Sequence, residues 1–148
     1  MSIKERLMAD LQKAMREHDQ VRRDTIRMAR AAIQNAEKAL LREATEDEVI
    51  EILNRQVKQR NESIEMFRQG HREDLVAEEQ AQLEILQEYL PQQLGRPEIE
   101  AALEAIIAEL GATSPQQLGT VMREAMTRLK GQADGRHVNE IARALLSR

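Results

Sequence analysis

The side chains that most often carry chemistry are scarce in this sequence and widely spaced. There is no cysteine, which excludes thiolate nucleophiles, disulfides and cysteine-ligated zinc. The serines lie outside any nucleophile-elbow or Ser-Lys motif. The 3 histidines form no His-x-x-x-His pair that could seat a zinc ion, and there is no P-loop and no GxGxxG motif. We therefore expect no catalytic residue, no metal and no cofactor.

One acidic motif, Thr45-Glu46-Asp47-Glu48, could in principle bind a hard cation through its carboxylates. The same residues have another use at the start of a helix. Acidic side chains in a first turn interact favourably with the helix dipole, and the Thr-x-x-Glu spacing is that of a capping box. We interpret the motif as helix capping.

The densest group of polar residues is KGQADGRHVN, residues 130–139. Helix boundaries explain three of them. Gly131 is expected in the left-handed conformation that closes one helix. Asp134 is the expected N-cap of the next helix, and Gly135 is expected to let two helices approach closely. A capping carboxylate at the positive end of a helix also argues against a phosphate-binding loop here.

Helix boundaries do not require the remaining polar residues of this region. These residues are Lys130, Arg136, His137, Asn139 and, one turn further on, Arg143. Positions 136, 139 and 143 follow the i, i+3, i+7 spacing, opposite an apolar face that contains Val138. The spacing predicts an exposed basic strip, which could bind RNA or could simply be a solvated helix face.

Arg60 is unusual because it lies within an apolar stripe formed by Leu53, Val57, Ile64 and Phe67. An unpaired guanidinium in that position would be costly. In one interpretation the stem lies on the core and the head pairs with Asp74 or with a glutamate of the following helix. In the other, the arginine faces a ligand in a groove between helices.

The charge is unevenly distributed along the chain, whose formal net charge is -4. Residues 1–44 carry ten basic and seven acidic side chains (+3), residues 45–110 carry six and sixteen (-10), and residues 111–148 carry six and three (+3). This asymmetry fits a polyanionic partner that touches only the basic parts, or solvated faces of uneven sign. A polar stripe of Arg23, Arg27, Arg30 and Gln34 is expected opposite the apolar face of its helix.

No apolar run approaches the roughly 20 residues that a membrane helix needs, and the first residues contain no apolar signal-peptide region. We therefore expect no membrane association and a cytoplasmic location. With 41% hydrophobic residues but one Phe, one Tyr and no Trp, any core must be aliphatic.

Helical periodicity extends over the whole chain, and no alternating strand pattern occurs. Ser2, Asp19 and Thr45 are expected N-caps, and Gly70 is expected to be the glycine that closes the third helix. The segment from Pro91 to Pro97 is the best boundary. The sequence predicts an all-α protein, with an N-terminal helical hairpin bundle of about four helices over residues 1–94 and a C-terminal three-helix mini-domain over residues 95–148.

Several short motifs, in their order and spacing, resemble the YqeY family nearly from end to end. They are Ile26-Arg27-Met28, Lys58-Gln59-Arg60, Gly70 to Leu75, Tyr89-Leu90-Pro91 with Gln93-Leu94, Leu118-Gly119 with Val121-Met122, and Lys130 to Asn139. The C-terminal module of this GatB/YqeY group is also the tail of GatB, a subunit of the amidotransferase that converts misacylated Glu-tRNA(Gln) or Asp-tRNA(Asn). Arg96-Pro97 departs from the Ser-Glu helix start that is common in the family, which leaves the capping of the fifth helix open.

The resemblance implies two helical domains, the second similar to the part of GatB that touches tRNA. It does not supply an activity for free-standing members, and a fold alone does not imply one. We expect a monomeric, non-catalytic tRNA-binding accessory protein that contacts phosphate and ribose. One alternative is a protein–protein adaptor that docks on an amidotransferase subunit or another partner. A third is an amide-transferring enzyme, a carbon–nitrogen ligase with glutamine as amido donor, a label inherited from GatB.

Overall fold

The computed structural model describes residues 1–148 and consists of seven α-helices and one short 3-10 helix, with no strand. The predicted all-α class is therefore confirmed. The chain forms two compact units, Met1–Leu90 and Pro91–Arg148. No helix combines the length and the apolar composition needed to cross a membrane.

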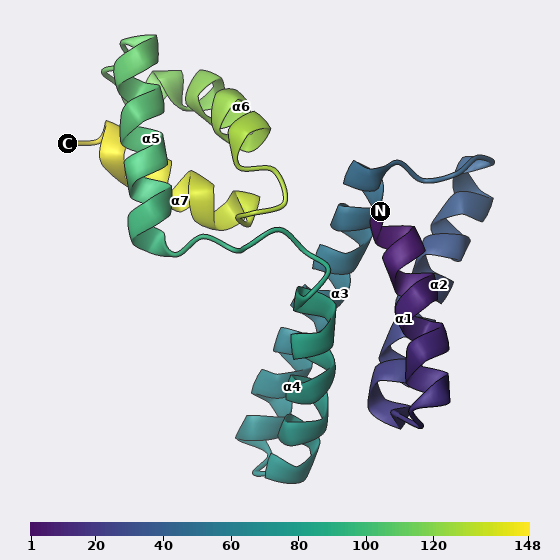
Figure 1. The fold of residues 1–148 in the computed structure, drawn as a ribbon. Helices are drawn as coiled ribbons and strands as arrows, with labels where there is room; N and C mark the ends of the chain where they lie inside the picture. Colours follow the sequence, from purple (N-terminus) through teal and green to yellow (C-terminus); the bar gives the residue numbers. More distant parts are fainter. The chain divides into compact units, whose positions relative to one another are not determined.

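The first unit is built from two helical hairpins (Figure 1). Its helices are α1 (Ile3–Arg16), α2 (Gln20–Leu40), α3 (Glu46–Gln69) and α4 (Glu73–Gln87). α1 packs along α2 and α3 packs along α4, while α2 also contacts both helices of the second hairpin. Helices that follow one another along the chain thus pack as two neighbouring pairs.

The predicted N-caps of the first three helices are confirmed. Ser2, Asp19 and Thr45 each accept a hydrogen bond from the backbone N–H three residues on, at 3.1, 3.1 and 3.2 Å. At Thr45 the capping box is complete, because its own N–H donates to Glu48 Oε1 at 3.0 Å. These bonds satisfy N–H groups that have no partner inside the helix, and so they fix where each helix begins.

The core of the first unit is aliphatic except for one tyrosine. Its buried residues are Ile3, Leu7, Leu11, Ile26, Ala29, Ile33, Val49, Ile52, Leu53, Ile85, Leu86 and Tyr89. A smaller cluster of Ile64, Val76 and Leu83 lies between α3 and α4, with Val57 and Phe67 packed against it. The pairing of α3 with α4 therefore has an apolar cluster of its own beyond the main core.

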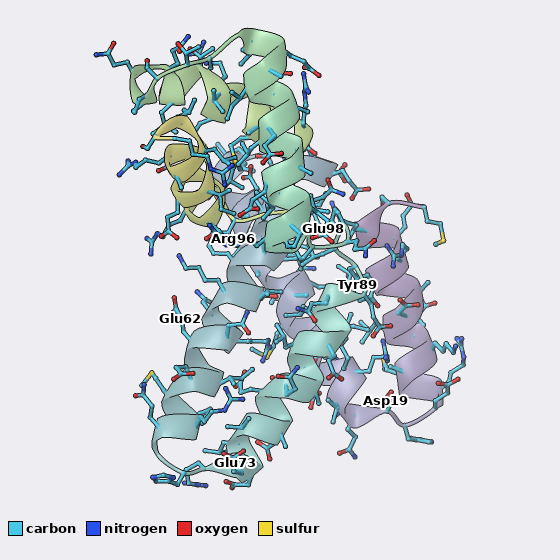
Figure 2. All side chains as sticks on the ribbon, turned by 90° about the vertical axis from the view of Figure 1, so that its left-hand side faces the viewer. Asp19, Glu62, Glu73, Tyr89, Arg96 and Glu98 are labelled. Carbon is cyan, nitrogen blue, oxygen red and sulfur yellow. The ribbon has the colours of Figure 1, made fainter.

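Tyr89 follows α4 and is only 3% exposed (Figure 2). Its hydroxyl donates a 2.5 Å hydrogen bond to Asp10 Oδ2 of α1, and the Arg6 guanidinium lies 5.0 Å from the centre of its ring. Burial, together with the neighbouring Asp10 carboxylate, raises the pKa of Tyr89 above its usual range. Arg6 also donates to the Glu88 carbonyl at 3.0 Å. The end of α4 is thereby joined to α1.

One helix end differs from the sequence expectation. Gly70 closes α3 as expected, but its φ is -84° and the residue in the left-handed conformation is His71, with φ 57°. The Gly70 N–H still donates to the Met66 carbonyl at 3.1 Å, so the chain reverses one residue later. α2 ends at Leu41, which has φ 58° and is 91% exposed.

The second unit packs three α-helices around a separate aliphatic core. Its elements are α5 (Arg96–Leu110), the 3-10 helix η1 (Pro115–Gln117), α6 (Leu118–Arg128) and α7 (Gly135–Leu146). Its buried residues are Ile99, Leu103, Ile106, Ala112, Val121, Ala125, Leu129, Val138, Ile141, Ala142 and Leu146. α5 begins after Gly95 without a side-chain cap (Figure 2 labels Arg96 and Glu98 at its start).

The segment that precedes α5 is tied to the loop between α6 and α7. Gln93 Nε2 donates to the Gly131 carbonyl at 2.7 Å, and the Leu94 N–H donates to the Gln132 carbonyl at 2.8 Å. Leu94 also packs against the core of the second unit. Residues 91–94 therefore belong structurally to the second unit.

Replacing Leu41 with glycine should stabilise the first unit. The left-handed conformation costs a residue with a Cβ atom about 1 kcal/mol, glycine does not incur this cost, and the exposed side chain contributes little packing. We expect Leu41→Gly to raise the free energy of unfolding by about 1 kcal/mol in a denaturant titration. Leu40→Gly, inside the helix, should lower it by a similar amount. A loss of stability in Leu41→Gly would contradict this account.

Candidate functional site

The predicted basic strip lies along α7. Arg136 and Arg143 are exposed and Asn139 is half-buried, whereas Val138 is fully buried in the core. Because successive residues of an α-helix are 100° apart, positions 136, 139 and 143 fall within about 60° of the helix surface. The structure thus brings these three residues together, and we call them the α7 strip.

The two arginines of the α7 strip make no ion pair with another side chain. Most other arginines of this unit are paired: Arg96 with Glu100, Arg128 with Glu109 and Glu124, and Arg148 with Glu104. Glu140, on the same helix, lies one turn from each arginine of the strip and reduces its net charge. The strip therefore presents two guanidinium groups to solvent with a partly compensated charge.

The other two predicted RNA-binding residues do not belong to the α7 strip. His137 is half-buried and lies about 100° around the helix from Arg136, on another side of α7. Lys130 is exposed and precedes the helix, in the turn that follows α6. Arg123 of α6 is also exposed and unpaired.

The loop before α7 has mainly a structural use. Gly131 has φ 77°, in the left-handed region. Asp134 occupies the N-cap position of α7, but its side chain makes no capping hydrogen bond. This corrects the expectation that the Asp134 carboxylate caps the helix. A Cβ atom at Gly135 would lie 3.6 Å from Met126 Cε, an ordinary contact, so close helix approach does not explain this glycine. The carbonyls of Gly131 and Gln132 hold the segment before α5.

Arg60 is 7% exposed and paired. Its Nη1 donates to Glu79 Oε2 at 3.1 Å and also to Gln82 Oε1, and its Nη2 contacts Met28 Sδ at 3.7 Å. Asp74, the other suggested partner, is bound by Arg72 instead, at 3.0 Å. The guanidinium therefore joins α3 to α4, and its partner is a glutamate of the following helix.

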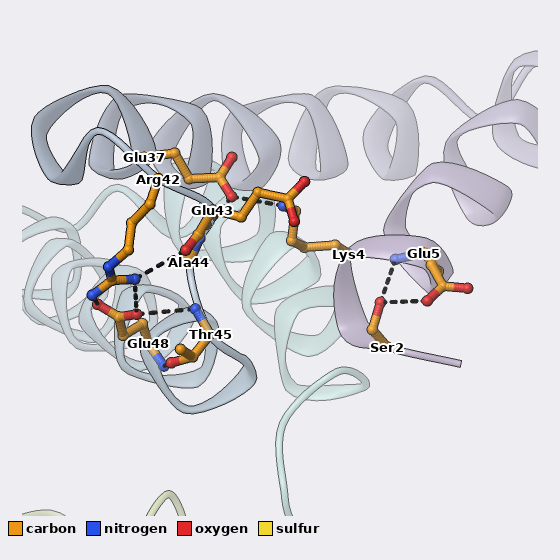
Figure 3. A network of polar contacts seen from close by, with 9 residues as sticks. All are labelled: Ser2, Lys4, Glu5, Glu37, Arg42, Glu43, Ala44, Thr45 and Glu48. Atoms are coloured by element: carbon orange, nitrogen blue, oxygen red, sulfur yellow. Dashed lines mark hydrogen bonds and ion pairs between the residues drawn. The ribbon is translucent and has the colours of Figure 1, made fainter.

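The carboxylates of the Thr45–Glu48 motif bind helix ends. Glu46 accepts from the Ile3 N–H, at 3.0 and 3.3 Å to its two oxygens, and so occupies the start of α1. Glu48 accepts from Arg42 at 2.8 Å as well as from the Thr45 N–H (Figure 3). The Arg42 bond, followed by the Thr45 N–H, lowers the pKa of Glu48 to about 2. No group of three His, Asp or Glu side chains is placed to hold a metal ion.

A pocket of about 360 Å³ lies beside these caps. Its lining residues are Ser2, Lys4, Glu5, Glu43, Ala44, Glu46 and Val49. Lys4, the one basic residue among them, is held by Glu37 at 2.6 Å (Figure 3). Three glutamates with one neutralised lysine make a surface that repels phosphate, so this pocket is not a candidate for an anionic ligand.

Comparison with known proteins gives one family. A family model described as Yqey-like protein matches residues 4–146. This chain is also similar to a protein of several fungi, named altered inheritance of mitochondria protein 41, mitochondrial. The Pyrenophora tritici-repentis protein is 36% identical over 138 residues, covering 91% of this chain and 76% of the relative. That of Lachancea thermotolerans is 34% identical over 112 residues (74% and 60%), and that of Saccharomyces cerevisiae strain YJM789 is 37% identical over 87 residues (58% and 47%).

These relatives correct the expected cytoplasmic location, because each is named as a mitochondrial protein. The expectation rested on the absence of a membrane-length apolar run and of an apolar signal-peptide region. Neither absence distinguishes the cytoplasm from another aqueous compartment.

The pairing of Arg60 with Glu79 should contribute strongly to stability. The side chains are 8% and 24% exposed, so removing the carboxylate leaves a buried guanidinium with Gln82 as its main acceptor. We expect Glu79→Ala to lower the free energy of unfolding by about 3 kcal/mol. The control is Glu65→Ala, which breaks an exposed pair with Arg68 on the same hairpin and should cost less than about 0.5 kcal/mol. Equal effects in a urea titration would contradict the assigned role of Arg60.

The Glu48 carboxyl should titrate with a pKa of about 2 when followed by NMR of its side-chain carbon. Because the folded pKa is lower than the unfolded value of about 4.3, this carboxylate stabilises the fold above pH 4.3. The contribution is lost as the pH falls towards 2. Arg42→Ala should bring the pKa back towards its ordinary value, and Glu48→Gln should flatten the acid dependence in this interval. A pKa near 4.3 in the unmodified protein would show that Arg42 does not bind Glu48.

Proposed function

The chain belongs to the family of YqeY-like proteins, and from this premise we propose that it is a non-catalytic tRNA-binding accessory protein. The observation that carries the proposal is the α7 strip, in which Arg136 and Arg143 are exposed and have no internal partner. Arginine donates hydrogen bonds in a planar fork that matches a phosphate group. Asn139, beside them, offers an amide to phosphate or ribose oxygens.

The composition of the second unit favours contact with the RNA backbone. The one Tyr and the one Phe of the chain both lie in the first unit, so the second unit has no aromatic ring on which a base could stack. Contacts to phosphate and ribose depend on the shape of a folded RNA and carry little sequence information. The α7 strip therefore fits a surface that positions a tRNA.

The surroundings of the hydroxyl and imidazole groups favour a binding role over catalysis. Ser2 caps α1, and Ser147 donates to the Arg143 carbonyl at 2.8 Å. His18 and His71 both lie at left-handed turn positions with φ 57° and are exposed. A nucleophile needs an adjacent base within hydrogen-bond reach, and neither serine donates its hydroxyl to a histidine.

A salt series with labelled tRNA tests the proposal. The variant Arg136→Gln/Arg143→Gln removes two charges and keeps good helix formers in their place. If each arginine neutralises one phosphate, the slope of log K against log salt should become shallower by about 1.4 to 1.8, at 0.7 to 0.9 per phosphate. The measurement is fluorescence anisotropy between low and moderate salt, with circular dichroism to check that helicity is kept.

The matched control is Arg96→Gln/Arg148→Gln, which removes the same charge from the same unit at arginines already paired with Glu100 and Glu104. Its slope should stay within experimental error of the unmodified protein. Equal losses in both variants would mean that net charge, not the α7 strip, governs binding. If the unmodified protein binds no tRNA, the proposed function is wrong and docking on a partner protein becomes the better explanation.

A further inference from the structure

A line of basic side chains runs along α2 in the first unit and has no part in the core or the helix caps. This α2 stripe consists of Arg23, Arg27, Arg30 and Lys38. These positions fall within about 80° of the helix surface and extend over about 22 Å along its axis. Arg27 and Lys38 are exposed, whereas Arg23 and Arg30 are half-buried, so the stripe extends from the edge of the core face to the exposed side of α2.

Most of the charge of the α2 stripe has no partner within the protein. Arg23 pairs with its neighbour Asp24 at 3.0 Å. The guanidinium of Arg27 contacts only a sulfur atom, Met15 Sδ, at 3.9 Å. Arg30 and Lys38 make no hydrogen bond or ion pair through their side chains. Three of the four cations are therefore available to an external anion.

The acidic residues of the same hairpin compensate little of this charge. Asp24 pairs with Arg23 of the stripe, and the other carboxylates within α1 and α2 are engaged elsewhere: Glu5 with Ser2, Asp10 with Tyr89, and Glu37 with Lys4 and the Ala44 N–H. The Lys4 bond, the largest cause, lowers the pKa of Glu37. The hairpin thus keeps its anions in structural contacts and leaves a row of cations on its surface.

An extended chain of phosphates fits this row better than a bilayer. A nucleic-acid backbone supplies negative charges along a continuous line, and arginine can donate to each phosphate in bidentate fashion. α2 contains no aromatic side chain that would anchor it in a membrane interface.

We propose that the α2 stripe is a second RNA-contacting surface, which binds the phosphates of an RNA backbone. The inference rests on the proposed tRNA binding and adds a site that the α7 strip does not include. Arg27, Arg30 and Lys38 would together neutralise three phosphates. Arg23 would contribute less, because Asp24 already holds its guanidinium.

The experiment uses the full chain and labelled tRNA over a salt series. Arg27→Gln/Arg30→Gln/Lys38→Gln should make the slope of log K against log salt shallower by about 2.1 to 2.7. The control, Arg55→Gln/Lys58→Gln/Arg68→Gln, removes the same charge from α3 of the same unit, where all three side chains are exposed. It should leave the slope unchanged. Circular dichroism and a melting curve of each variant confirm that the helices are intact.

Three outcomes overturn the inference, and they are distinguishable from one another. If the α2 variant binds like the unmodified protein while Arg136→Gln/Arg143→Gln loses affinity, the second surface does not exist and the proposed function stands. If the unmodified protein does not bind tRNA, both proposals fail. If it binds vesicles with 30% anionic lipid through the α2 stripe more tightly than tRNA, the surface recognises a membrane. A loss specific to the α2 variant, with no vesicle binding, supports the inference.

Discussion

The hydrogen bond from the buried Tyr89 hydroxyl to Asp10 is the interaction on which the first unit most depends. The rest of that core is aliphatic, and contacts between Leu, Ile and Val side chains fix distance much better than direction. A buried hydroxyl needs a partner, so this bond selects one alignment of the end of α4 with α1. Arg6 reinforces it through two contacts, one with the tyrosine ring and one with the Glu88 carbonyl.

The arginines of this protein divide into two groups with different uses. One group holds helices together or binds a nearby carboxylate, as Arg60 does with Glu79 and Arg128 with Glu109. The other group, Arg27 and Arg30 on α2 with Arg136 and Arg143 on α7, makes no ion pair with a carboxylate. An exposed ion pair is worth little to stability, so leaving these side chains unpaired costs the fold little while it keeps them available to a partner. The arginines that make no ion pair within the protein are therefore the best candidates for binding a partner.

The sequence predicted correctly the features that depend on residues close to one another along a helix. The N-caps at Ser2, Asp19 and Thr45 are local patterns, and so is the helical periodicity that gives the all-α class. It failed where the decisive contact is distant or where tertiary structure overrides preference. The left-handed conformations of Leu41 and His71 run against residue propensity. The bond from Gln93 to Gly131 joins positions 38 residues apart, which helical periodicity cannot reveal. For the α7 strip, the sequence predicted which residues share a helix face but not whether their side chains form ion pairs.

The contacts of Gln93 and Leu94 have a consequence for the C-terminal unit as a portable module. Such a unit can be transferred between longer proteins only if the transferred segment contains all residues that its loops bind. A graft that began at the first residue of α5 would leave the Gly131 and Gln132 carbonyls without their donors and remove an apolar side chain from the core. A complete C-terminal unit therefore begins no later than Gln93, and recombination between Gln93 and the start of α5 would remove these contacts.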